Sequence, residues 1–330
     1  MTTERELILE MQSVLQDKMK KDYEKGNTKR DAHPKCLGLL KADFKILNNL
    51  PEEFQEGIFK PGSSYKAWIR VSNASGRVQS DKEKDFRGFA LKLLGVNGER
   101  IDSGELNTQD FVLMSNPTMP LGTVKLFRDA VYYSIKWHPL VLALKFVLTG
   151  HKNILAALNN GKHNDTSPLD IKYWSTTPYQ YGNKKVKYKI APSSKNRSSL
   201  PQELTDDYLT INMATHLRSH VATFDFYIQQ FSDETNTPIE DAGIEWKEAY
   251  SPFIKVAEIT IPVQELNTKS RFELAEQLSF SPANSLKAHQ PIGGLNRARV
   301  KIYRFLSKFR HQRDDKKLYE PKLNEFEQTK

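Results

Sequence analysis

Two consecutive runs of alternating residues restrict the fold of this chain more than any other feature of its sequence. They read "YKAWIRVSNASG" (65–76) and "RGFALKLLGVNG" (87–98), and each ends in turn residues. A period of two places successive side chains on opposite faces of a sheet, and a turn after each run favours antiparallel pairing. We therefore expect residues 37–94 to be mostly β-structure.

Further strands and several helices are predicted by the same patterns. The strand runs are "TQDFVLMSNP" (108–117), "GNKKVKYKIAP" (182–192), "HVATFDFYIQQFSD" (220–233) and "PFIKVAEITIPV" (252–263). In the second of these, lysines alternate with apolar residues, which predicts one solvent-exposed face. Helical periodicity covers 4–24, 124–160 with a break at "WHP", 201–217, 270–279 and 295–311.

The order of these elements predicts an α+β fold. Neither an internal repeat nor a Pro/Gly/Ser-rich linker divides the sequence. We expect an N-terminal helical arm at 1–25 and a single domain at 26–330.

The net charge and the cysteine content limit the classes of partner and the cellular compartment that we expect for this chain. The 330-residue chain carries a formal net charge of +9, which favours nucleic acid, an anionic membrane surface or an acidic small molecule without choosing among them. A single cysteine, Cys36, excludes an intrachain disulfide and fits a reducing compartment. Residues 1–20 do not resemble a secretory signal, and the apolar run at 139–150 is too short to span a bilayer. A cytoplasmic location is expected.

One tyrosine in the 295–311 helix lies between two arginines on the same face. Arg299 precedes Tyr303 by one helical turn, and Arg310 follows it by two turns. A neighbouring guanidinium stabilises a phenolate, and a phenolate oxygen is a hard anionic ligand for ferric iron. The ordinary alternative is a solvated basic face on a terminal helix.

Four segments in this order resemble the catalase superfamily over most of the chain, from Arg30 to His311. "RDAH" (30–33) is similar to the Arg-x-x-His segment of that family, which carries its distal histidine. "RVSNASG" (70–76) with "DFRGFALKL" (85–93) is similar to the Arg-x-Ser and Asp-x-Arg-Gly-Phe-Ala segments. "RVKIY" (299–303) matches the proximal Arg-x-x-x-Tyr. The length resembles the small branch of catalase-related peroxidases and allene oxide synthase-like enzymes.

The resemblance implies a catalase-like antiparallel β-barrel enclosing haem, with helices packed outside. The implied cofactor is haem b with ferric iron. It also implies a role for each of nine residues: Tyr303 as iron ligand, Arg299 as its cationic partner, His33 as distal acid/base oriented by Ser72, Asn116 as distal asparagine, Arg30, Arg70 and Arg310 as propionate partners, and Tyr133 as a ring stacked on the haem.

The implied function is a haem-dependent peroxidase that reduces organic or lipid hydroperoxides, with some activity on hydrogen peroxide. A fatty acid hydroperoxide isomerase or lyase is the enzymatic alternative, and a non-catalytic protein that binds haem or anionic lipid is the other. The expected partners are a peroxide and a small organic electron donor. Nucleic acid is not expected, while peripheral membrane contact and a homo-oligomer stay open.

Overall fold

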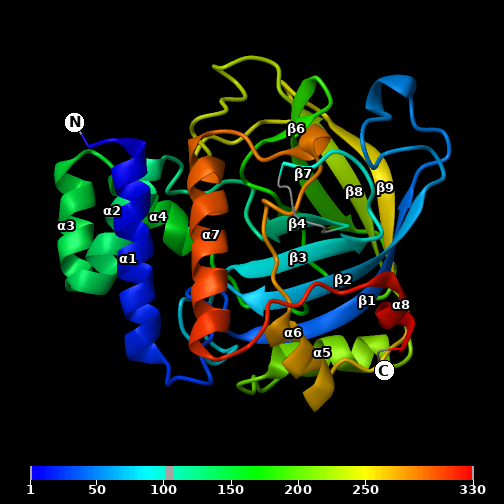
Figure 1. Cartoon of the computed structure of the whole chain (residues 1–330), viewed down its shortest axis with the longest axis horizontal. Helices are drawn as coiled ribbons and strands as arrows, with labels where there is room; N and C mark the ends of the chain where they lie inside the picture. Colours follow the sequence, from blue (N-terminus) through cyan, green and yellow to red (C-terminus); the bar gives the residue numbers. More distant parts are fainter. Residues whose placement is uncertain (1, 102–106, 329–330) are drawn as a thin grey trace.

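The computed structural model describes residues 2–101 and 107–328 and contains a β-sheet that closes on itself (Figure 1). Its strands are β1 (Cys36–Ile46), β2 (Ser64–Asn73), β3 (Arg87–Leu94), β4 (Thr108–Met114), β5 (Tyr173–Trp174), β6 (Tyr179–Tyr181), β7 (Lys184–Pro192), β8 (Ala222–Gln230) and β9 (Phe253–Ile261). The strand order is β5-β4-β3-β2-β1-β9-β8-β7-β6, and a β5–β7 pairing closes the ring. All the strand pairs are antiparallel. The predicted α+β class with a catalase-like antiparallel barrel is confirmed.

The barrel interior is filled by aromatic side chains. The ring of Phe226 lies 5.1 Å from those of Phe44 and Phe111, and Phe111 lies 4.9 Å from Tyr188, measured between centroids. All four side chains are fully or almost fully buried. No room is left inside for a macrocycle, because protein interiors pack to the density of organic crystals. Any space large enough for a cofactor must therefore lie outside the barrel.

The helices cover the outside of the barrel and extend away from it. They are α1 (Glu4–Asp22), α2 (Val124–Lys136), α3 (Pro139–Leu148), α4 (Lys152–Asn160), α5 (Tyr208–Leu217), α6 (Lys269–Gln277), α7 (Gly294–Arg313) and α8 (Leu323–Gln328). Figure 1 shows α7 beside the barrel, with α1 to α4 on its other side. Within the described ranges, none of these helices is long and apolar enough to cross a membrane.

The N-terminal helix begins at a capping box and packs on the closing helix. The Thr3 side chain accepts a hydrogen bond from the Glu6 backbone, and the Glu6 carboxylate accepts one from the Thr3 backbone. Its buried residues Ile8, Met11 and Leu15 share one apolar cluster with α7. α1 thereby fixes the outer side of α7, whose other side meets the cavity described below.

Three sequence predictions differ from the structure in detail. The region 124–160 forms three helices rather than two, because a second break separates α3 from α4. The predicted helix at 201–217 begins only at Tyr208, because the preceding Asp206 and Asp207 interact with Ser80 and Lys35 instead. The lysine face of β7 is not fully exposed: Lys187 is 4% exposed and its ammonium lies 4.8 Å from the Trp246 ring centroid. The loop carrying Trp246 covers this face, which alternation along β7 alone could not indicate.

Candidate functional site

A cavity lies between the outer face of β2–β4 and α7. Its empty volume is about 800 Å³, which includes space at its open mouth. The strands contribute Arg70, Ser72, Gly88, Phe89, Ala90, Val112 and Leu113; α7 contributes Tyr303, Leu306, Ser307 and Arg310; Met19, residues 30–33, Ser279 and Phe280 complete the lining. The cavity thus brings together the segments that the sequence resemblance singles out.

His33 reaches the cavity from a strained turn before β1. Its φ of 56° lies in the left-handed region, which costs about 1–3 kcal/mol for a non-glycine residue and is common at functional sites. Its Nδ1 lies 3.0 Å from Ser72 Oγ, and its backbone carbonyl accepts a hydrogen bond from Arg70 at 2.8 Å. With Nδ1 engaged by Ser72, Nε2 is the ring nitrogen left for a bound molecule.

Gly88 makes room for this arrangement. A Cβ atom at Gly88 would lie 2.6 Å from His33 Nδ1 and 2.7 Å from Ser72 Oγ. Only glycine allows the imidazole to lie flat against β3 at this point. The glycine of the Asp-x-Arg-Gly segment therefore serves the histidine rather than a turn.

The environment of His33 disfavours its protonated form. Burial, followed by the charges of Arg70, Arg299 and Arg30, lowers the pKa of His33 to about 3. The imidazole is consequently neutral at neutral pH, and its free nitrogen can accept a proton.

Three arginines converge at one end of the cavity around a single carboxylate. Arg30 and Arg310 lie 3.1 Å and 3.8 Å from Glu276 Oε2, and Arg70 lies 3.9 Å from Oε1. Burial favours the neutral form of Glu276, yet the three guanidinium groups hold its pKa below the ordinary value. Three cations against Glu276 and the nearby Asp31 leave the cluster with a local excess of positive charge.

The excess positive charge affects the pKa of Arg30, and Arg70 has an unpartnered donor in the part of the chain that the structure describes. Burial, and then repulsion from Arg70, lowers the pKa of Arg30 to about 9. The buried Arg70 Nε has no hydrogen-bond partner within the described residues. Buried cations and orphaned donors are costly unless they are paired. This end of the cavity is therefore suited to bind one or two further carboxylates.

Tyr303 lies on α7, and the buried guanidinium of Arg299, one helical turn earlier, lies next to its ring. The Arg299 guanidinium carbon is 5.6 Å from the Tyr303 ring centroid, and Nη1 donates to Thr177 Oγ1 at 2.7 Å and Asn296 Oδ1 at 3.0 Å. Burial lowers the pKa of Arg299, but Tyr303 and Tyr179 outweigh this effect and raise it. These hydrogen-bond acceptors are neutral, so an anion at Tyr303 would neutralise the buried charge.

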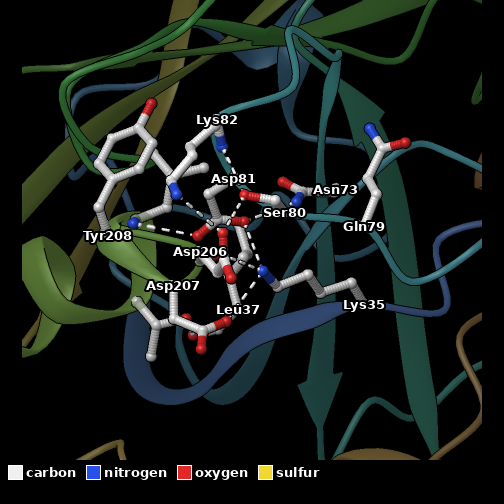
Figure 2. Close-up of polar contacts among 12 residues, drawn as sticks. Lys35, Leu37, Asn73, Gln79, Ser80, Asp81, Lys82, Asp206, Asp207 and Tyr208 are labelled. Carbon is white, nitrogen blue, oxygen red and sulfur yellow. Dashed lines mark hydrogen bonds and ion pairs between the residues drawn. The ribbon is translucent and has the colours of Figure 1, made fainter. Parts of the chain in front are cut away.

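A second polar network lies next to the His33–Ser72 contact and joins the chain segments that carry these two residues. Figure 2 shows Lys35 bridging Asp81 and Asp207, with Nζ 2.9 Å from each carboxylate. Asp81 also accepts hydrogen bonds from Asn73 Nδ2 at 2.8 Å and the Leu209 amide at 3.1 Å. Lys35 follows His33 by two residues and Asn73 follows Ser72 directly, so the network holds both segments that form the His33–Ser72 contact.

Replacing Asp81 by asparagine is expected to lower the free energy of unfolding by about 3 kcal/mol, because Lys35 would lose its buried partner. Urea unfolding measures this loss. Asp207→Asn is the matched control: its side chain is 68% exposed, so its ion pair with Lys35 should contribute less than about 1 kcal/mol. Equal effects of the two substitutions would contradict the role given to Asp81.

Two predicted site residues lie away from the cavity. Asn116 follows the end of β4, where its amide donates to Thr118 O at 2.8 Å within the same turn. Tyr133 faces the helical layer on α2, and Lys145 lies 4.6 Å from its ring centroid. Neither residue lines the cavity, so the structure gives no support to their predicted roles. The other seven lie in the cavity wall or, for Arg299, directly behind it.

Sequence reasoning missed Glu276, Gly88 and Asp81. Glu276 lies on α6, more than two hundred residues from Arg30 and Arg70, and no local pattern connects them. The "RGFA" motif contained Gly88, but its contact with His33 depends on a turn far from it in sequence. Asp81 lies in an irregular loop without any periodic signal.

Comparison with known proteins finds similarity in structure only. No protein-family model and no curated protein matches the sequence. Similar solved structures include a fungal catalase (TM-score 0.67, 15% identity), catalase A from Saccharomyces cerevisiae (0.68, 16%) and a bacterial catalase (0.65, 16%). The matches cover 89% of this chain but 63%, 64% and 60% of those chains, so it spans less than two thirds of their length. The fold is catalase-like.

Proposed function

We propose that this chain is a haem-dependent peroxidase that reduces organic or lipid hydroperoxides and belongs among the small relatives of catalase. The observation that carries the proposal is the convergence of Tyr303, His33 and three arginines on one cavity. A tyrosine oxygen, a neutral imidazole and an excess of cations are the groups needed around a ferric macrocycle with two carboxylates.

The residues present fit haem b. Arg30, Arg70 and Arg310 would hold its two propionates, which supply the negative charge that the cluster lacks beyond Glu276. Apolar side chains such as Val112, Phe280 and Leu306 line the remainder, as suits a porphyrin ring. Tyr303 would provide the oxygen ligand, and Arg299 would stabilise it as a phenolate.

Bound ferric haem would supply the redox centre at which the O–O bond is cleaved. His33 would accept the hydroperoxide proton at Nε2 and return it to the departing oxygen, while Ser72 holds Nδ1. Two electrons and two protons, with the electrons drawn from an organic donor, convert ROOH to ROH and water. His33 can begin this cycle as a base because it is neutral at working pH.

An organic hydroperoxide suits this cavity better than hydrogen peroxide does. Beside Ser72 and Gly88, the strand wall presents Ala90 and Val112, and no asparagine or glutamine is among the described lining residues. An apolar wall binds a hydrocarbon chain through the hydrophobic effect but offers no second hydrogen bond to a small peroxide. The same wall would suit a fatty acid hydroperoxide isomerase or lyase, which is the second candidate.

Product analysis separates the candidates. Haem-loaded protein is given a fatty acid hydroperoxide with an organic donor such as guaiacol, and the products are identified by mass spectrometry. We expect the alcohol, with oxidised donor formed in proportion, and little oxygen evolution from hydrogen peroxide. An epoxide or aldehyde formed without donor would favour the isomerase or lyase, and rapid oxygen evolution would favour a catalase.

A further inference from the structure

The outer face of α3 is apolar and exposed to solvent. Leu140, Leu144 and Leu148, which recur every four residues, are 71%, 59% and 76% exposed. Val147 at 55% and the adjoining Trp137 at 56% extend the same surface. A surface helix normally turns such a stripe toward the core, and a contiguous apolar patch on the outside marks an interaction site.

The one charged side chain of α3 is turned inward. Lys145 Nζ lies 3.3 Å from a carboxylate oxygen of Asp129, whose side chain is 7% exposed. On the same inner side, Phe146 is 1% exposed and packs with Ala130 and Ile154. The helix thus pairs its one charged side chain, which is 29% exposed, with Asp129 of α2, while three of its four leucines face solvent.

The surroundings of this face are positively charged. Residues 130–164 contain four lysines and no aspartate or glutamate. Lys152 and Lys162, at the two ends of α4, are exposed, whereas Lys136 is paired with Asp17 of α1 at 3.1 Å. Figure 1 shows α3 at the edge of the molecule, with α1, α2 and α4 between it and α7. Nothing described in the chain covers this face, and a flat partner can reach it.

We propose that α3 docks on the surface of an anionic lipid bilayer and lies in the plane of the interface. Its ten residues span about 15 Å, half of a hydrocarbon core, so it rests on the bilayer rather than crossing it. The leucines enter the acyl boundary, Trp137 lies at headgroup level, and the lysines contact anionic headgroups. A second copy of the chain is less complementary, since two positive surfaces would meet. The proposal rests on this surface alone and not on the chemistry of the cavity.

Flotation of the full-length chain with vesicles tests the docking. We expect binding to phosphatidylcholine vesicles that contain phosphatidylserine, and much weaker binding to phosphatidylcholine alone. Combining Leu140→Ser, Leu144→Ser and Leu148→Ser should reduce binding by more than about tenfold. Lys152→Glu should reduce it by at least about fivefold, the contribution of one cation near an anionic surface.

A matched control removes leucines of similar exposure elsewhere. Leu200, Leu318 and Leu323 are 47%, 54% and 49% exposed, and their combined replacement by serine should leave vesicle binding unchanged. Equal losses in the two triple variants, or equal binding to both kinds of vesicle, would overturn the proposal. So would self-association that disappears in the α3 variant while the wild-type chain fails to float.

Tryptophan fluorescence gives an independent readout on a variant that retains its fold. Trp137 is exposed, whereas Trp68 and Trp246 are buried at 1% and 3% exposure. Anionic vesicles should shift the emission to shorter wavelength as Trp137 leaves water. Trp137→Phe should remove most of this shift while flotation largely persists, and an undiminished shift would place the contact elsewhere.

Discussion

Replacing Tyr303 by phenylalanine is expected to weaken the binding of ferric haem by more than about 100-fold, because the variant lacks the only protein oxygen proposed to bind the iron. The ring remains, so the packing of α7 should change little. Haem titration followed by absorbance, with the folded state checked by circular dichroism, measures the effect. The expected result is a folded chain that loses haem on gel filtration.

The control for this substitution is Tyr250→Phe, which removes an exposed phenol far from α7 in the sequence; Tyr250 is 54% exposed. It should bind haem like the unmodified chain. If Tyr303→Phe also bound haem with unaltered affinity and an unchanged spectrum, Tyr303 would not be the ligand. Loss of folding in Tyr303→Phe would instead assign it a structural role.

His33→Ala is expected to retain haem but to lower hydroperoxide turnover by about 10²–10⁴-fold, the usual contribution of general acid–base catalysis. The imidazole is neutral and has one free nitrogen, and no other histidine lines the cavity within the described residues. Stopped-flow measurement of the reaction with a fatty acid hydroperoxide provides the rate. His220→Ala, at an exposed histidine, should react normally. An unimpaired His33→Ala would remove the acid/base from the mechanism.

The pKa of His33 adds a pH signature to this variant. Its folded-state pKa of about 3 lies below the ordinary value of about 6.5, chiefly because of burial. The folded protein therefore binds this proton less tightly than the unfolded chain does. This difference in proton binding makes its full contribution to the free energy of unfolding above about pH 6.5. The contribution declines as the pH falls toward 3. His33→Gln should flatten that decline in acid unfolding, and the His33 ring resonance should not titrate between pH 8 and 5.

Much of the fold could be predicted from local patterns. Alternation identified β2, β3, β4, β7, β8 and β9, because each of these strands has one face against the aromatic core. The two-residue and three-residue strands β5 and β6 escaped notice, although β5 closes the barrel. Such short strands carry no periodic signal, and their pairing depends on the rest of the barrel.

The site residues also differ in how far the local sequence could indicate them. His33, Ser72 and Tyr303 were predicted from short segments that resemble the catalase superfamily, and all three line the cavity. Asn116 was selected only as the amide near the end of β4, and the turn at Pro117 directs it away from the cavity. Glu276 could not be anticipated, since its contacts join three segments distant in sequence.

The resonance Raman spectrum of the purified chain loaded with ferric haem would report the Tyr303–iron bond directly. In the proposed complex the Tyr303 oxygen would bind the iron of a haem held in the cavity that His33 lines. We expect phenolate modes that are enhanced by excitation of the iron–oxygen charge-transfer band and are absent from Tyr303→Phe. A histidine-ligated or unligated haem spectrum in the unmodified chain would contradict this ligand assignment.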